Sequence, residues 1–215
     1  MTNKRLWQDD YWLLIIQQYL CKPVGIKPIF NRKMVELSLE LHITPQELHQ
    51  RLGDLARLRT PRIERLWREY GENPRRLSRA VSLLRSMKGF NSGGEFFEGV
   101  DVQETFELDF RPIPEDQRLT PIMLIIILDL YFRLTPITMV SLTPEVQELA
   151  RLIRIPTALV VDVLEVFQYC DPYLNRRDKT ASPLLMPCKK IWQRYGNNDA
   201  RQLADYAEQL KVYFQ

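Results

Sequence analysis

One ten-residue pattern occurs twice in this chain of 215 residues, and it constrains the fold more than any other feature. Residues 67–76 read Trp-Arg-Glu-Tyr-Gly-Glu-Asn-Pro-Arg-Arg, and residues 192–201 read Trp-Gln-Arg-Tyr-Gly-Asn-Asn-Asp-Ala-Arg. Trp, Tyr, Gly, Asn and the final Arg recur at the same places. A long-period repeat is the signature of one structural unit used more than once. The sequence therefore predicts an internal duplication.

The match extends upstream of this pattern at an offset of 112 residues. Tyr19 falls on Tyr131 and Ile43 falls on Ile155 at that offset. The Trp pattern itself needs an offset of 125, so the second copy has gained 13 residues. We place them in the polar stretch 171–187, which we expect to be a surface loop.

Apolar residues at helical spacing predict five helices in the first copy. These helices begin near Asp10, before Met34, at Pro45, near Arg62 and after Pro74. Asp9 or Asp10 is expected to cap the first helix, and Thr44 the third, with Pro45 at its first position and Glu47 completing a capping box. The second and third helices form a helix-turn-helix-like pair. The predicted fold class is all-α, with two repeated small helical bundles.

Charge divides the chain into three parts. Residues 1–90 carry 17 Lys and Arg against 9 Asp and Glu, residues 91–118 carry 2 against 8, and residues 119–215 carry 11 against 10. Differences of this size between segments indicate different partners or roles. We predict a basic first repeat, an acidic connector and a nearly neutral second repeat over these ranges.

Within the connector, apolar and polar residues alternate from Val100 to Phe110, which predicts an extended segment. This arm either lies across the helical core with its backbone partly solvated, or pairs with its twin in a second subunit or with a partner's strand. Homo-oligomerisation through residues 95–114, or through the second repeat, is therefore a possible outcome. The acidic side chains have two interpretations of their own. They belong to a solvated linker, or Asp101, Glu107 and Asp109 dock on the basic first half and compete with nucleic acid.

The repeat resembles a helical domain that precedes the catalytic part of some bacterial HNH-type nucleases. The resemblance is carried by Pro-Glu-Val-Gln-Glu-Leu-Ala at 144–150, Asp-Pro at 171–172 and Ile-Trp-Gln-Arg-Tyr-Gly-Asn-Asn at 191–198. The first copy matches at 36–37 and 66–73. This resemblance implies a helical fold, but the nuclease part is absent, so nuclease activity is not implied.

The third helix of the first copy has a polar face opposite its leucines, and arginines follow it in the chain. Gln and Arg side chains make paired hydrogen bonds to base edges, and clustered arginines bind phosphates. The sequence therefore predicts binding of double-stranded DNA, in a regulatory or accessory role. The alternative is that these are solvated arginines partly paired with neighbouring glutamates. The predicted nucleic-acid-binding residues are Gln46, His49, Gln50, Arg57, Arg59, Arg62, Arg65, Arg68, Arg75 and Arg76.

The equivalent helix of the second copy lacks this polar face. It carries Thr157, Ala158, Val161, Asp162 and Glu165 instead, an apolar and acidic set that phosphate would repel. We expect it to be buried in the protein or at a subunit interface. The alternative function is accordingly a non-enzymatic protein-interaction or homo-oligomeric scaffold that uses the connector arm and the second repeat.

Enzyme function is not expected, because the sequence contains none of the common catalytic motifs. His42 and His49 have no Ser or Cys partner nearby in sequence, and there is no Gly-rich phosphate loop or Cys-x-x-Cys. No catalytic residue, metal site or cofactor is predicted. Trp67 and Trp192 fit a core position better than a platform for stacking bases. Three cysteines at no motif spacing, and no apolar run long enough for a membrane, predict a cytoplasmic protein without membrane partners.

Overall fold

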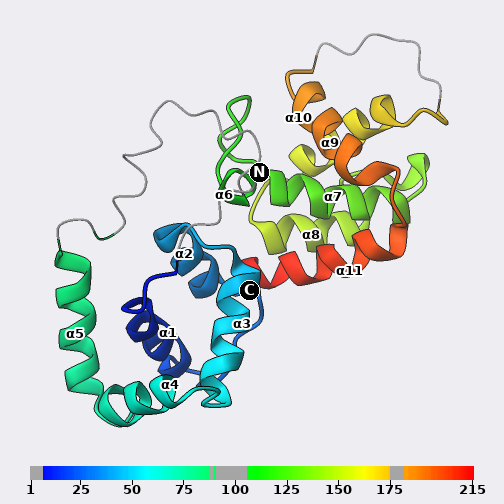
Figure 1. Ribbon diagram of the computed structural model, residues 1–215. Coiled ribbons are helices and arrows are strands. Elements are labelled where there is room, and N and C mark those ends of the chain that lie inside the picture. Colours follow the sequence, from blue (N-terminus) through cyan, green and yellow to red (C-terminus); the bar gives the residue numbers. More distant parts are fainter. Residues whose placement is uncertain (1–6, 88–89, 91–105, 175–181) are drawn as a thin grey trace. The chain divides into compact units, whose positions relative to one another are not determined.

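The computed structural model describes residues 7–87, 90, 106–174 and 182–215. Over these ranges the chain is helical, with eleven α-helices and no β-strand (Figure 1). The predicted all-α class is confirmed. The chain divides into two compact units, which we call unit 1 (residues 1–103) and unit 2 (residues 104–215). The division falls inside the predicted connector.

Unit 1 is built around its first helix, α1. Helix α1 contacts α3, α4 and α5, and the apolar side chains of Leu14, Ile15 and Ile16 are fully buried there. The predicted leucines of α3 supply the facing side of this core. In chain order the elements are α1 (Tyr11–Leu20), α2 (Arg32–Leu41), α3 (Pro45–Ala56), α4 (Pro61–Leu66), a π-helical turn (Trp67–Gly71) and α5 (Pro74–Ser86).

Two of the predicted helix starts in unit 1 differ in detail from expectation. Thr44 caps α3 as predicted, since its hydroxyl accepts the Glu47 N–H at 3.3 Å. The Glu47 carboxylate, however, lies 3.5 Å from the Arg51 guanidinium, so only half of the capping box is formed. Asp10 makes no side-chain cap on α1, and the Asp9 carboxylate pairs with Arg62 at 2.7 Å. In each case a carboxylate that was expected to bond the backbone at the helix start, Glu47 or Asp9, pairs with an arginine instead.

A tight turn joins α2 to α3. His42 adopts a left-handed conformation at φ 55°, and the Ile43 N–H donates to the Ser38 carbonyl at 3.1 Å. The same geometry joins α8 (Pro144–Ile153) to α9 (Thr157–Cys170) in unit 2, where Arg154 has φ 59°. The helix-turn-helix-like pair predicted for the first copy is thus present as a local structure.

Unit 2 is built around α7 (Pro121–Arg133), which contacts α8, α9, α10 and α11. Nine of its thirteen residues are buried, as expected for a helix that is apolar on most sides. Its one buried carboxylate, Asp129, accepts from Arg133 at 2.8 Å. The remaining elements are α6 (Phe106–Asp109), short 3-10 turns (Pro136–Thr138 and Val212–Phe214), α10 (Leu185–Ile191), a π-helical turn (Trp192–Gly196) and α11 (Ala200–Lys211).

The extended conformation predicted for residues 100–110 is wrong over Phe106–Asp109, which form the helix α6. Two contacts explain the difference. Glu107 pairs with Arg111 at 3.6 Å, a spacing of four residues that a helical turn brings together. The Phe110 ring packs edge-on against Tyr213 with centroids 5.4 Å apart. Residues 95–105 of the predicted arm lie outside the described residues.

The surface loop predicted for residues 171–187 ends earlier than expected. Residues 171–174 are irregular, residues 175–181 are outside the described ranges, and Pro187 lies inside α10. Pro187 occupies the first turn of that helix, where a backbone N–H has no partner within the helix and its absence costs nothing.

Candidate nucleic-acid interface

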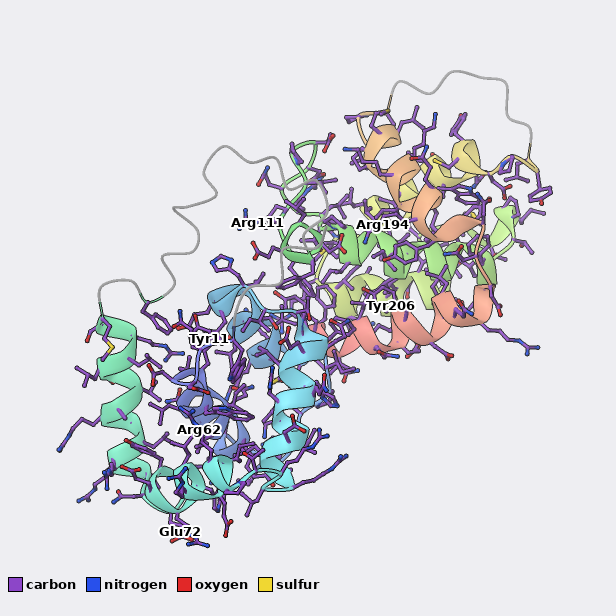
Figure 2. All side chains as sticks on the ribbon, in the orientation of Figure 1. Tyr11, Arg62, Glu72, Arg111, Arg194 and Tyr206 are labelled. Carbon is purple, nitrogen blue, oxygen red and sulfur yellow. The ribbon has the colours of Figure 1, made fainter. Side chains whose placement is uncertain are left out.

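The richest concentration of positive charge in unit 1 follows α3. We call residues 57–79 the basic corner, because the chain turns there from α4 into α5 (Figure 2, where Arg62 and Glu72 are labelled). Local caps fix this corner. Thr60 accepts the Ile63 N–H at 3.3 Å and Asn73 accepts the Arg76 N–H at 3.2 Å. Eight arginines stand against three glutamates in this segment.

Four arginines predicted to bind nucleic acid are held by carboxylates. Arg59 lies 2.9 Å from Asp54 and Arg62 lies 2.7 Å from Asp9. Arg68 pairs with Glu64, and Arg76 pairs with Glu69 while its guanidinium also lies over the Tyr70 ring. All four guanidinium groups remain exposed, and exposed ion pairs contribute only about 0–1 kcal/mol each. A phosphate can therefore replace the carboxylate at little cost.

The other arginines of the basic corner carry no ion pair within the described residues. Arg57, Arg65 and Arg75 are exposed, and so is Arg79, which the sequence-based site did not include. The signal for Arg79 was its position, four residues after Arg75 on the same helix face. Arg75 lies in the first turn of α5, which contains no acidic residue. A positive side chain there opposes the helix dipole, and a bound anion would relieve that repulsion.

Helix α3 presents Gln46 and Gln50 to solvent, one turn apart, with Leu48 and Leu52 buried on its other side. His49, also predicted as a nucleic-acid contact, is placed differently. Its Nδ1 donates to the Lys27 carbonyl at 3.0 Å, which ties α3 to the loop after α1. Gln46 and Gln50 are therefore the side chains that α3 offers to a ligand.

Lys27 is a buried cation that the sequence pattern did not reveal. Its ammonium donates to the carbonyls of Cys21 (2.8 Å), Gly25 (3.1 Å) and Pro23, so each of its three protons has an acceptor. Burial lowers the pKa of this ammonium. Three backbone carbonyls, and no carboxylate, stabilise the buried ammonium. A set of backbone acceptors leaves no pattern of residue types in the sequence, so it could not be predicted. Lys27 thereby organises the loop on which His49 is anchored.

Two carboxylates of the acidic connector, those of Asp109 and Glu107, pair with arginines of unit 2. Both Asp109 oxygens accept from the guanidinium of Arg194 (labelled in Figure 2), at 2.7 and 2.9 Å, and this pair raises the pKa of Arg194. Glu107 is engaged by Arg111. Both carboxylates thus have an arginine partner within unit 2, and their competition with nucleic acid on the first half stays a prediction. Asp101, the third predicted residue, lies outside the described ranges.

Two other kinds of feature are absent from the part of the chain that the structure describes. Nowhere in residues 7–87, 90, 106–174 and 182–215 do three or more His, Cys, Asp or Glu side chains gather in a way that would hold a metal ion. Across the same ranges every helix falls short of the length and apolar character that a membrane crossing demands.

Comparison with known proteins adds no relative to this picture. A scan against protein-family models finds no match, and searches of curated proteins and of solved structures find no significant similarity. The resemblance to the helical domain of HNH-type nucleases stays a prediction.

Proposed function

We propose that unit 1 binds nucleic acid, with double-stranded DNA as the ligand, in a regulatory or accessory role and without catalysis. The observation that carries this proposal is the set of exposed arginines without carboxylate partners in the described residues. They lie in a segment with eight arginines and three glutamates. Such a surface supplies the sequence-independent, electrostatic part of DNA binding. This set is Arg57, Arg65, Arg75 and Arg79.

In this proposal the two parts of the interface have different tasks. The arginines of the basic corner contact phosphates and fix the orientation of the duplex. Helix α3 enters the major groove, where Gln46 and Gln50 meet base edges. A glutamine amide matches the donor and acceptor pair that adenine exposes in that groove.

We also propose that the two units are copies of one fold with different roles. The left-handed residues His42 and Arg154 are 112 positions apart and close the same kind of turn. The Tyr19–Trp67 ring contact in unit 1 has a counterpart in Tyr131–Trp192 in unit 2. In unit 2 the helix corresponding to α3 exposes acidic side chains, so the binding role falls to unit 1.

The helix caps refine the alignment of the copies. Asn73 caps α5 and Asp199 caps α11, which favours an offset of 126 from Asn73 onward in place of the 125 that aligns Trp67 with Trp192. Arg75 then corresponds to Arg201, and Arg76 corresponds to Gln202. Unit 1 keeps one more positive charge than unit 2 at this helix start, which supports the assignment of the binding role.

The experiment is a titration of duplex DNA with the full chain at several salt concentrations. Binding that weakens steeply with salt supports the proposal, and no binding at the lowest salt contradicts it. The variant Arg65→Gln/Arg75→Gln should bind more weakly to all sequences, with a salt slope lower by about 2. Arg151→Gln/Arg201→Gln in unit 2 is the matched control, and it should bind as the unaltered chain does.

A further inference from the structure

The connection between α7 and α8 in unit 2 exposes large aliphatic side chains. We call residues 134–142 the apolar loop. Ile137 is 88% exposed, Leu142 84% and Val140 46%, and Phe132 just before the loop is 40% exposed. Isolated exposed aliphatic residues are ordinary, but several on one short loop indicate an interaction surface.

The apolar loop is held in one conformation by its own hydrogen bonds. The Thr135 N–H donates to the Thr138 hydroxyl at 3.0 Å, and the Thr138 N–H donates back to the Thr135 carbonyl at 2.9 Å. The Thr143 hydroxyl bonds the Thr138 carbonyl, and the Gln147 amide bonds the Ser141 carbonyl at 3.2 Å. A loop ordered in advance loses little conformational entropy on association.

The loop is also anchored to the core by one inward residue. Met139 is buried, and the Gln168 side-chain N–H points at its sulfur at 3.2 Å. Because buried Met139 fixes the middle of the loop, Ile137 before it and Leu142 after it face outward. Their exposure is a property of the folded loop.

Leu142 is exposed for a reason that can be read from the helix start that follows. It directly precedes Thr143, the N-cap residue of α8. An apolar residue just before an N-cap often packs on the fourth residue of the helix. That fourth residue is Gln147, which is polar and exposed. In unit 1 the matching pair is Phe30 and Val35, and both are buried. Leu142 therefore faces outward at the start of α8, whereas Phe30 at the start of α2 faces inward.

The lack of charge on the apolar loop favours a second copy of this chain as the partner that covers it. Residues 134–143 contain no Asp, Glu, Lys or Arg. Arg133, next to the loop, is engaged by Asp129. A charged residue near a two-fold axis meets its own copy, so a surface without charge can pair with itself without repulsion. Unit 2 as a whole carries 13 Lys and Arg against 15 Asp and Glu, which does not favour an anionic lipid surface.

We propose that the apolar loop is a self-association surface, on which Ile137, Val140 and Leu142 of two copies pack together across a two-fold axis. The few residues involved place this contact at the small end of protein interfaces. The resulting dimer exchanges with monomer and depends on protein concentration. This proposal is independent of nucleic-acid binding.

The test is the molar mass of the full chain in solution, measured by sedimentation equilibrium over a wide concentration range without DNA. The chain should approach the mass of a dimer as concentration rises, and Ile137→Ser/Leu142→Ser should raise the dimer dissociation constant by roughly a hundredfold. The matched control is Val24→Ser/Leu83→Ser, which alters two exposed aliphatic residues of unit 1 and should leave the constant unchanged.

A second pair of variants tests the uncharged two-fold contact. Ser141→Glu should weaken the dimer, and high salt should restore part of the lost affinity because it screens the repulsion between the two carboxylates. Ser141→Gln should dimerise as the unaltered chain does. Far-UV circular dichroism checks that each variant is folded. A chain that stays monomeric throughout, or a double variant that dimerises normally, overturns the proposal. So does a monomer that floats with phosphatidylcholine vesicles through Ile137 and Leu142, since the loop would then be a lipid contact.

Discussion

The indole ring of Trp67 lies directly against the backbone of Gly71. A β-carbon built at position 71 would approach the Cδ2 atom of the ring to 2.6 Å, and Gly196 stands in the same relation to Trp192. Neither glycine has a positive φ among the described residues. Gly71 ends its helical segment as predicted, but glycine is required there by the ring and not by a left-handed turn.

Gly71→Ala and Gly196→Ala should therefore each destabilise the protein, by about 1–3 kcal/mol, because the added methyl group overpacks the contact. Gly53→Ala is the internal comparison. It lies within α3 with no atom in the way of a β-carbon, and the helix should gain about 0.5–1 kcal/mol. Urea unfolding followed by circular dichroism measures all three, and an unchanged Gly71→Ala would show that the ring moves away freely.

Trp192→Ala should cost more stability than Trp67→Ala. Trp192 is buried against Tyr131, Phe132 and Phe167, whereas Trp67 is half-buried with an edge-on contact to Tyr19. Removing a buried Trp costs about 3–5 kcal/mol. Circular dichroism is the suitable signal, since the substitution removes a fluorophore. DNA binding that is lost by a stably folded Trp67→Ala would mean that the ring contacts the ligand.

The parts of the fold that follow from local rules were predictable. Helical spacing and the Thr44-Pro45 start located α3, and the sequence offset of 112 residues pointed to a helix where α9 lies. Contacts between distant residues were not predictable. The alternation of residues 100–110 favoured a strand, yet Asp109 is drawn into a helical turn by Arg194, which is 85 positions later. The partners of Arg62 and Arg85, namely Asp9 and Glu40, come from other helices or their flanks in the same way.

His49→Ala should reduce stability rather than act mainly on binding. The substitution removes the bond from Nδ1 to the Lys27 carbonyl, and a hydrogen bond of this kind contributes about 1 kcal/mol. Gln46→Ala and Gln50→Ala, which alter exposed side chains, should stay within about 0.5 kcal/mol of the unaltered chain. Their effect should appear as reduced discrimination between duplexes of different sequence. If His49→Ala reduced DNA binding without loss of stability, His49 would be a nucleic-acid contact as the sequence predicted.

The Asp109–Arg194 pair should hold α6 on unit 2. Asp109→Ala should raise the hydrogen-exchange rate of residues 106–111 while α7, at the centre of the unit, stays protected. Asp116→Ala, which breaks the neighbouring pair with Arg118, serves as the comparison and should leave α6 unaffected. A double-mutant cycle with Arg194→Ala should give a coupling of about 1 kcal/mol, given the partial exposure of the guanidinium.

Stability should fall in alkaline solution as cysteine thiols of unit 2 ionise. Burial raises the pKa of Cys170 to about 11 and also raises the pKa of Cys188. A raised pKa in the folded state contributes stability that is complete below the pKa of the unfolded thiol, 9.0, and is lost as pH rises through the folded value. Between pH 9.0 and about pH 11, the free energy of unfolding of Cys170→Ala should fall by about 1–2 kcal/mol less than that of the unaltered chain, after allowance for partial exposure.

The buried ammonium of Lys27 has a consequence for how salt acts on this protein. Where another chain would recruit a potassium ion to neutralise converging carbonyls, this chain carries a covalently attached cation that no electrolyte can exchange or dilute. The scaffold beneath α3 should accordingly be indifferent to the ionic composition of the medium. Electrostatic responses of unit 1 to added salt should then come from its exposed charged side chains.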